Sequence, residues 1–378
     1  MTTKIQWTEE TWNPVAGCSV VSPGCTNCYA MRRQAPRLAA NPATPQYHGT
    51  IQKTKAGAVW TGKIGIAGDT TFLKPLHTRR PTMWFVNSMS DLFHENVTDE
   101  VIDRVFAIMA LCPQHTFQIL TKRSARMRDY MNDERAPFRI PRVILDMWAD
   151  GSRRVRDVAA SPDWPVKTVG NIDDPDDVEL TAWPLPNVWL GVSVEDQTRA
   201  DERIPGLLAT PAAIRFISAE PLLGPVDLTN LGGGCWSESW DALKGKHWVA
   251  GAGSINSSTH KAPRLDWVIV GGESGKGARP MHPDWARSIR DQCAAAAVPY
   301  FFKQWGEYLG GEASDHGDTV WFDAASSRRH SRYIQNKDAF NWFDPDKAPD
   351  GPAWLKTGTK AAGRMLDDRE HNAMPEVG

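Results

Sequence analysis

The chain has 378 residues, 41% of them hydrophobic, and its net charge of −2 at pH 7 gives no global sign of a nucleic-acid partner. This length exceeds that of most single domains and suits one large α/β domain with insertions. No apolar run approaches a membrane span of about 20 residues, and the start MTTKIQWTEE lacks the pattern of a signal peptide, so we expect a cytoplasmic protein that does not enter a membrane.

The first motif along the chain is WNPVAGCSVVSPGCTNCYA, residues 12 to 30, and we expect a strand just before its cysteines. Its three cysteines have C-x6-C-x2-C spacing: Cys18, Cys25 and Cys28. A closed zinc site needs a fourth ligand, and His48, His77 or Cys235 could supply it, although none has zinc-knuckle spacing. Three thiolates suffice for a [4Fe–4S] cluster that leaves one iron open to a ligand. The motif therefore predicts a cluster, with structural zinc as the alternative.

From residue 82 onward, short apolar runs alternate with polar turns and amphipathic stretches, which is the pattern of repeated βα units. Six runs are expected strands: 82–88, 115–122, 187–194, 213–220, 266–273 and 299–306. Helical spacing of apolar residues predicts helices within 99–112 and 282–297. Together with the strand before the cysteines, the pattern predicts a partial or complete parallel (βα) barrel of about six strands or more, as in TIM barrels.

Two stretches rich in Gly, Ser, Pro and charge interrupt this pattern, and we interpret 131–186 and 229–265 as surface insertions. After residue 306 the βα alternation stops. We therefore expect one barrel domain over residues 1–306 and a C-terminal extension over residues 307–378. Cys112 and Cys293 lie in apolar helical stretches and are expected to be core thiols.

Polar residues follow the expected strands at their carboxyl ends, where parallel sheets and barrels place their chemistry. The candidates are Ser88, Ser90, Lys122, Ser193, Glu220 and Glu273. A carboxylate directly after a buried strand is costly unless it meets a cation or an amine. Five polar strand ends predict one shared pocket, although a polar turn is also an ordinary way for a strand to end.

The residues around the cysteines match a known group in more than spacing. WNPVAGC and GCTNCYA, with VNSMSD and ILTKR at two later strand ends, resemble radical S-adenosylmethionine enzymes of the spore photoproduct lyase-like group. LPNVWLGVSVE, AEPLLGP, VIVGGESG and KAAGRMLDDR resemble a phage and bacterial three-cysteine-motif family, over most of the chain apart from the insertions. The loop departs from the commonest radical pattern in its six-residue first spacer and in Asn27, which stands where an aromatic residue would precede the last cysteine.

The resemblance implies that Cys18, Cys25 and Cys28 hold a [4Fe–4S] cluster whose open iron binds S-adenosylmethionine. It implies reductive cleavage to a 5′-deoxyadenosyl radical, fed by a flavodoxin- or ferredoxin-like electron donor. Motif matching also gives roles to side chains around the cofactor. Tyr29 would stack near adenine, Ser88 or Ser90 and Ser193 would hold ribose or methionine, Lys122 would meet the carboxylate, and Glu220 or Glu273 would bind an amine.

The sequence says less about the substrate. Basic stretches at 31–37, 77–82, 121–128 and 151–156, together with 17 Trp, favour modification or repair of a nucleic acid base or nucleotide. Solvated helices and a Trp-rich core are the alternative explanation. No cysteine lies between residues 82 and 94, so a thiol hydrogen donor at that strand end is not expected. An iron–sulfur redox sensor and a zinc-binding interaction protein remain alternatives, which the polar strand ends disfavour.

Overall fold

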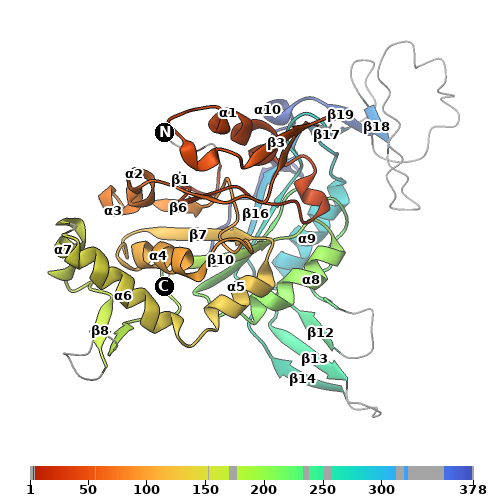
Figure 1. Ribbon diagram of the computed structural model, residues 1–378. Coiled ribbons are helices and arrows are strands. Elements are labelled where there is room, and N and C mark those ends of the chain that lie inside the picture. Colours follow the sequence, from red (N-terminus) through yellow and green to blue (C-terminus); the bar gives the residue numbers. More distant parts are fainter. Residues whose placement is uncertain are drawn as a thin grey trace, which may run out of the picture. The chain divides into compact units, whose positions relative to one another are not determined.

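The computed structural model describes residues 3, 5–55, 57–151, 153–169, 177–232, 238–250, 257–311, 319–321 and 353–376. Seven strands form a parallel sheet in the order β1-β6-β7-β10-β11-β15-β16 (Figure 1). Their bounds are β1 (Glu10–Trp12), β6 (Met83–Val86), β7 (Thr116–Thr121), β10 (Val188–Ser193), β11 (Ile214–Ala219), β15 (Trp267–Gly271) and β16 (Tyr300–Gln304). Because β1 and β16 lie at the two ends of this order, the sheet is a partial barrel, and the expected α/β fold class is confirmed.

All six expected runs after residue 82 contain a strand of this sheet, and β1 precedes the cysteines as expected. The predicted helices also form, as α4 (Asp99–Ala110) and α9 (Pro283–Ala295). Every residue of β10 and of β15 is buried. That pattern is typical of parallel strands covered on both faces, which need continuous apolar runs rather than alternation.

The chain divides into two compact units, and the first comprises residues 1–193, 202–217 and 261–266. Its cysteine-bearing part contains β2 (Val15–Ala16), η1 (Pro23–Cys25), the π-helix η2 (Ala30–Gln34), α1 (Ala35–Ala39), η3 (Pro45–Tyr47), β3 (Ile51–Thr54), β4 (Gly57–Trp60) and β5 (Gly65–Ile66). Further along it contains α2 (Asp69–Phe72), α3 (Lys74–His77), α5 (Ser124–Met131), α6 (Ala136–Ala149), α7 (Arg153–Ala159), β8 (Val166–Thr168) and β9 (Val178–Leu180). The described residues of the stretch 131–186 therefore carry two helices, α6 and α7, and the hairpin β8–β9, and α6 packs against α4.

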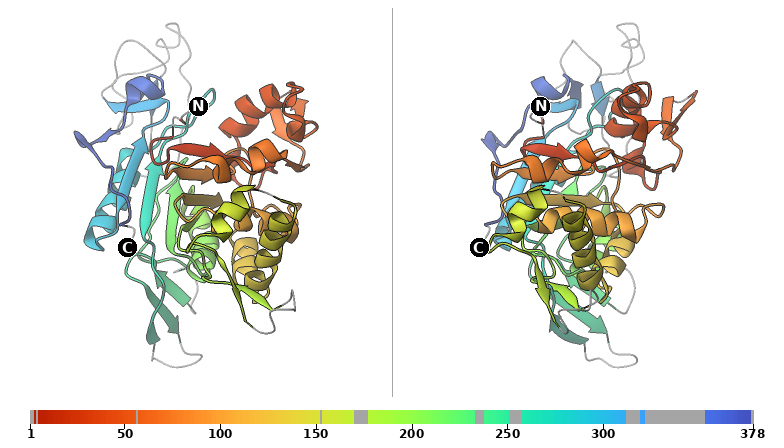
Figure 2. Two further views of the ribbon diagram at one scale, coloured as in Figure 1. Left: turned by 90° about the vertical axis from the view of Figure 1, so that its left-hand side faces the viewer. Right: turned by 60° about the vertical axis from the view of Figure 1, so that its left-hand side comes forward.

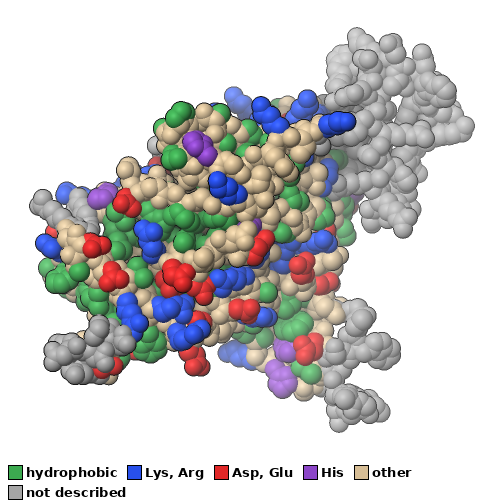
Figure 3. Space-filling view, viewed as in Figure 1, with side chains coloured by type: hydrophobic (Ala, Val, Ile, Leu, Met, Phe, Trp, Pro, Cys, Tyr) green, Lys and Arg blue, Asp and Glu red, His purple; other side chains and the backbone are tan. Residues whose placement is uncertain are grey.

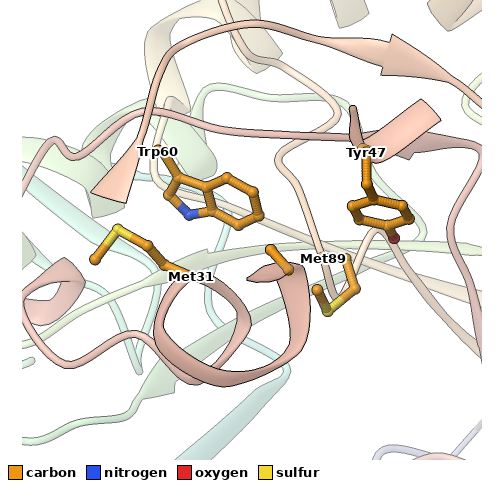
Figure 4. Packing of buried hydrophobic residues seen from close by; sticks show 6 residues of the cluster. Met31, Tyr47, Trp60 and Met89 are labelled. Carbon is orange, nitrogen blue, oxygen red and sulfur yellow. The ribbon is translucent and has the colours of Figure 1, made fainter. Parts of the chain in front are cut away.

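A small hydrophobic cluster lies under the cysteine loop of this unit. Met31, Tyr47, Trp60 and Met89 pack together with two alanines, and Cys18 and Cys28 pack against them among other half-buried residues (Figure 4). Burial in this cluster raises the pKa of Tyr47 to about 12. The cluster joins η2, η3, β4 and the loop after β6, so the cysteine loop rests on a packed base rather than on solvent.

Tryptophans supply much of the core of both units. Among the tryptophans whose burial the structure describes, eight are buried: Trp7, Trp12, Trp60, Trp84, Trp189, Trp267, Trp285 and Trp305. Trp12, in β1, donates its indole N–H to the carbonyl oxygens of Thr71 at 3.1 Å and Phe72 at 3.2 Å. Large amphipathic rings of this kind bury much apolar area when the N–H finds an acceptor. These eight rings therefore belong to the packed core and not to a surface that stacks bases.

The second unit comprises residues 194–201, 218–260 and 267–378. Within it α9 packs against β15 and β16 (Figure 2). Along the chain, α8 (Gln197–Leu208) and β14 (Ser257–Lys261) each cross a boundary between the units. A three-stranded sheet has the order β12 (Glu238–Asp241), β13 (Lys246–Ala250), β14. The last elements are β17 (Tyr308–Gly311), β18 (Thr319–Trp321), β19 (Ala353–Lys356), α10 (Thr359–Ala362), β20 (Met365–Leu366) and β21 (Arg369–Glu370). None of the described helices combines the length and the apolar character that crossing a membrane requires.

Candidate functional site

Asparagine side chains join the start of the cysteine loop to the turn after β6. Asn13 Oδ1 accepts hydrogen bonds from Ser88 Oγ and from the Met89 N–H, both at 3.1 Å. Asn87, in the left-handed region at φ 59°, accepts the Val15 N–H at 3.3 Å through its own Oδ1. Asn tolerates this conformation better than most side chains. The WNP and VNS motifs are therefore two halves of one hydrogen-bonded turn.

Gly17 sets the position of the first cysteine. Its φ of 92° lies in the left-handed region, and a Cβ atom there would stand 2.1 Å from the carbonyl oxygen of Lys63. Only glycine meets both conditions without strain. One residue later, the Cys18 carbonyl accepts the Gly62 N–H at 3.1 Å. The segment that leads into β5 thus fixes the backbone on which the Cys18 thiol is carried.

The three cysteines of the motif are close enough to act on one another electrostatically. Cys25 is buried, and Cys18 and Cys28 are half-buried. Burial first, then the charges of Asp91 and of the other two thiols, raises the pKa of Cys18 to about 12, although Arg123 opposes this. Burial and the Cys25 thiol also raise the pKa of Cys28. One loop therefore carries three soft ligands, and burial favours the protonated thiol at Cys18 and at Cys28.

This donor set fits a cationic iron–sulfur group. A bound metal deprotonates its thiol ligands outright, which offsets both burial and mutual repulsion. Among the described residues, no three His, Cys, Asp or Glu side chains are grouped to hold a single metal ion. Cys235, considered as a fourth zinc ligand, lies outside the described residues.

Arg123, two residues after the end of β7, connects the cysteine loop to two strand ends. Its guanidinium, only 10% exposed, contacts Asp91 Oδ2 at 3.0 Å and Glu95 Oε2 at 2.6 Å. It also donates to Ser19 Oγ at 2.6 Å and lies 3.9 Å from Cys18 Sγ. A positive charge at this point offsets part of the negative charge that deprotonated thiols would bring.

Asp91, in the turn after β6, is the partner that holds Arg123 in place. Its carboxylate also accepts Thr121 Oγ at 2.6 Å and the Lys122 N–H at 3.1 Å. Although burial opposes it, the hydrogen bond from Arg123 lowers the pKa of the neighbouring Glu95 to about 2. The carboxyl ends of β6 and β7 are therefore locked together beside the cysteine loop, as expected for neighbouring parallel strands.

The predicted cofactor-binding residues of this unit occupy different settings. Lys122 is half-buried and lies near enough to Cys28 to lower the pKa of its thiol, against the larger effect of burial. Ser193 is buried at the end of β10, beside the β7 end. Ser90 Oγ donates to the Val15 carbonyl at 2.8 Å, so it joins Ser88 in fastening the loop. Tyr29 is 53% exposed, and its hydroxyl accepts a hydrogen bond from Gln34.

The two predicted glutamates lie in the second unit, and each has a cation of its own. Lys303 Nζ contacts both carboxylate oxygens of Glu220 at 2.8 Å. Arg279 donates its Nε–H to Glu273 Oε2 at 2.7 Å. We expected each of these carboxylates to need a cation or an amine, and Lys303 and Arg279 of the same chain are those cations. In the GGESG stretch, a Cβ at Gly272 would lie 1.9 Å from the Trp305 carbonyl oxygen, so this glycine permits close packing.

Sequence reasoning missed the network around Arg123. Asp91 and Arg123 were visible as polar residues at strand ends, which was the available signal, but nothing in the sequence pairs them. Ser19 and His94 were missed altogether; Ser19 Oγ lies 3.0 Å from His94 Nε2 and donates to Glu95 at 3.1 Å. Pairings across 75 residues depend on the parallel order of the strands, which local patterns do not specify.

The other cysteines and several basic stretches have structural roles. Cys112 and Cys293 are buried, which confirms them as core thiols, and burial raises the pKa of each to about 12. In the stretches 77–82 and 121–128, arginines pair with acids, as Arg80 does with Glu9 at 3.1 Å. Arg126 likewise pairs with Asp99. These pairs reduce the positive charge that two of the four basic stretches offer to a partner.

Comparison with known proteins gives one family and one solved structure to report. Residues 2–375 match the family DUF5131, described as a protein of unknown function. No curated protein matches the chain. A mutant spore photoproduct lyase matches with a TM-score of 0.28 and 11% sequence identity, over 78% of this chain and 75% of that chain. A likeness this weak carries no weight for the fold or the function.

Proposed function

We propose that this chain, which belongs to the DUF5131 family of proteins of unknown function, is a radical S-adenosylmethionine enzyme. The observation that carries the proposal is a loop with three thiols at C-x6-C-x2-C spacing, in which Cys18 and Cys28 pack against one hydrophobic cluster and Cys18 Sγ lies 3.9 Å from the Arg123 guanidinium. Cys18, Cys25 and Cys28 would hold a [4Fe–4S] cluster. When bound, the cluster and S-adenosylmethionine would supply reductive cleavage to a 5′-deoxyadenosyl radical that abstracts hydrogen.

The side chains of the first unit would bind and orient the cofactor. Lys122 would meet the carboxylate of the methionine moiety, because it is a half-buried cation beside Cys28. Ser193 would hold a ribose or methionine oxygen from the neighbouring strand end, and the exposed ring of Tyr29 would stack near adenine. Ser88 and Ser90 would contribute mainly by holding the loop, since their hydroxyls already donate within it.

Other parts of the proposal concern partners. To bind the amine of a cofactor or substrate, Glu220 would have to release Lys303, and Glu273 would have to release Arg279. A nucleic acid base or a nucleotide is the proposed substrate class, and a flavodoxin- or ferredoxin-like protein the electron donor. The basic stretch 31–37 supports an anionic partner better than 77–82 and 121–128, whose arginines pair with acids.

Metal content tests the cluster. After anaerobic reconstitution with iron and sulfide, we expect about four irons per chain. The Cys25→Ala variant should lose most of this iron, whereas Cys293→Ala, a matched change at a buried thiol outside the motif, should retain it. Stoichiometric zinc without iron or sulfide would contradict the proposal and favour a zinc-binding interaction protein.

Cofactor cleavage tests the enzyme. With dithionite as reductant, the reconstituted protein should convert S-adenosylmethionine to 5′-deoxyadenosine. Lys122→Ala should weaken cofactor binding by about tenfold, the effect of losing one charge-assisted contact, without loss of iron. If the cluster assembles but neither its spectrum responds to S-adenosylmethionine nor deoxyadenosine forms, the redox-sensor alternative is favoured.

A further inference from the structure

The segment that surrounds the three thiols has an unusual charge. Residues 11–68 contain no Asp or Glu. They contain six cations: Arg32, Arg33, Arg37, Lys53, Lys55 and Lys63. Since the whole chain has a net charge of −2, the remaining residues carry −8 (−2 − 6 = −8). Such separation of charge does not help the chain to fold, and it indicates an acidic partner for this segment, which we call the cationic segment.

The fold places one of these cations at the cysteine loop and leaves most of the others exposed. Arg32 donates its Nε–H to the Thr26 carbonyl at 3.1 Å, between the second and third cysteines. The same guanidinium lies over the β3–β4 hairpin, 2.6 Å from where a Cβ on Gly57 would be. Arg33, Arg37 and the hairpin lysines are exposed. In Figure 3, Lys and Arg side chains, and no acidic ones, are visible over α1 and β3.

Apolar side chains are also exposed on this segment of the chain. Val20 and Val21, in the first spacer of the cysteine motif, are 49% and 43% exposed. Transient protein interfaces combine such an apolar centre with a charged rim. Phosphate groups make no favourable contact with two adjacent valines. Exposed apolar side chains together with positive charge therefore favour a protein partner over a nucleic acid.

We propose that the cationic segment is the docking surface for a small acidic protein that carries single electrons. The inference rests on the proposed function: the carrier would give up one electron and be oxidised, and a cluster held by the three thiols would be reduced by that electron. Docking at Val20 and Val21, which lie between Cys18 and Cys25 in the chain, places the carrier beside the thiols. Electrostatic steering suits this task, because it speeds encounter without the large interface that would slow release.

Binding, measured without turnover, tests the docking surface. The probe is an oxidised acidic flavodoxin, titrated against the anaerobically purified protein by calorimetry at several salt concentrations. Affinity should fall steeply with salt and should fall about tenfold at low salt in the triple variant Arg33→Gln, Arg37→Gln, Lys53→Gln. The control triple is Arg128→Gln, Arg135→Gln, Arg142→Gln, which removes three exposed charges outside the segment and should bind within about twofold of wild type.

Reductant choice separates this inference from the proposed function. With dithionite, both triple variants should form 5′-deoxyadenosine at the wild-type rate; with reduced flavodoxin, only the segment variant should slow, by about tenfold. Equal flavodoxin affinity of the two triples would overturn the docking surface. The proposal would also be overturned if a DNA duplex bound the protein through these three cations and flavodoxin did not bind. Absence of deoxyadenosine from every protein would count against the enzyme, and the titrations would still decide the docking surface.

Discussion

At the scale of single residues, the site depends on a cation that local sequence patterns do not identify. The cysteine triad and Lys122 could be selected from spacing and position alone. Arg123 could not, because its importance comes from two acids, Asp91 and Glu95, about 30 positions earlier in the chain. A buried arginine that contacts a loop hydroxyl and two carboxylates fixes geometry more than it adds net stability.

Replacing Arg123 tests this assignment. Arg123→Met should lower the free energy of unfolding by about 3 kcal/mol, because it leaves Asp91 buried without its cation. The matched change Arg135→Met breaks a pair whose arginine is 83% exposed and should cost less than about 1 kcal/mol. Urea titrations measure both. Adding Asp91→Asn to Arg123→Met should recover part of the loss, and purely additive costs would show that the two residues do not act as a pair.

At the scale of elements, the strands could be predicted from sequence and several helices could not. Apolar runs such as 187–194 became strands because their side chains are buried on both faces, so composition alone identified them. In contrast, α6 and α8 contain Pro141 and Pro205 in their interiors, which argue locally against a helix. α6 forms nevertheless, since Ile140 and Ile144 on its buried face are fully covered. Tertiary packing thus outweighs the local signal.

The turn into the cysteine loop gives a prediction at this scale. Gly17 and Gly62 both have φ near 90°, but a Cβ at Gly62 would meet nothing within 4 Å, whereas one at Gly17 would meet the Lys63 carbonyl. Gly62→Ala should therefore cost only the left-handed strain, about 1 to 2 kcal/mol. Gly17→Ala should cost about 2 kcal/mol more from the clash and should reduce iron retention by moving Cys18. Equal unfolding free energies, with full iron content in both variants, would contradict this role of Gly17.

At the scale of the whole molecule, the fold class followed from the repeated βα pattern, but the closure of the barrel did not. Closure depends on whether the first and last strands pair, and β1 and β16 are about 290 positions apart in a chain whose local patterns specify only neighbouring units. The sequence therefore allowed a partial or a complete barrel, and the strand order shows a partial one. The net charge of the whole chain is equally uninformative about local surfaces, because a total of −2 conceals a charge of +6 on the segment around the thiols.

Three histidines distributed over both units share one hydrogen-bonding pattern. His94, His115 and His282 each accept a backbone N–H at Nδ1, at 3.1, 3.2 and 3.1 Å respectively. Burial lowers the pKa of all three rings from the usual value of 6.5. Protonation would turn Nδ1 into a donor, which could no longer accept the backbone N–H. The folded protein therefore favours the neutral form of these rings.

The stability of the protein should therefore fall as the pH drops below 6.5. In that range the unfolded chain takes up a proton at each histidine while the folded chain does not, and each ring contributes a slope of up to about 1.4 kcal/mol per pH unit. The loss stops growing once the pH passes the lower pKa of the folded ring.

Replacing His115 tests this pH dependence. In His115→Asn, the Asn side chain can accept the Thr82 N–H at Oδ1 in place of the ring Nδ1, so the variant should keep that contact and its stability should depend less on pH. Urea titrations of both proteins between pH 7.5 and pH 5 measure the two slopes. Because His115 is neutral at pH 7.5 in either state, the difference between the proteins there gives the cost of repacking. If the variant loses stability with acid as steeply as the wild type, His115 does not resist protonation in the folded protein.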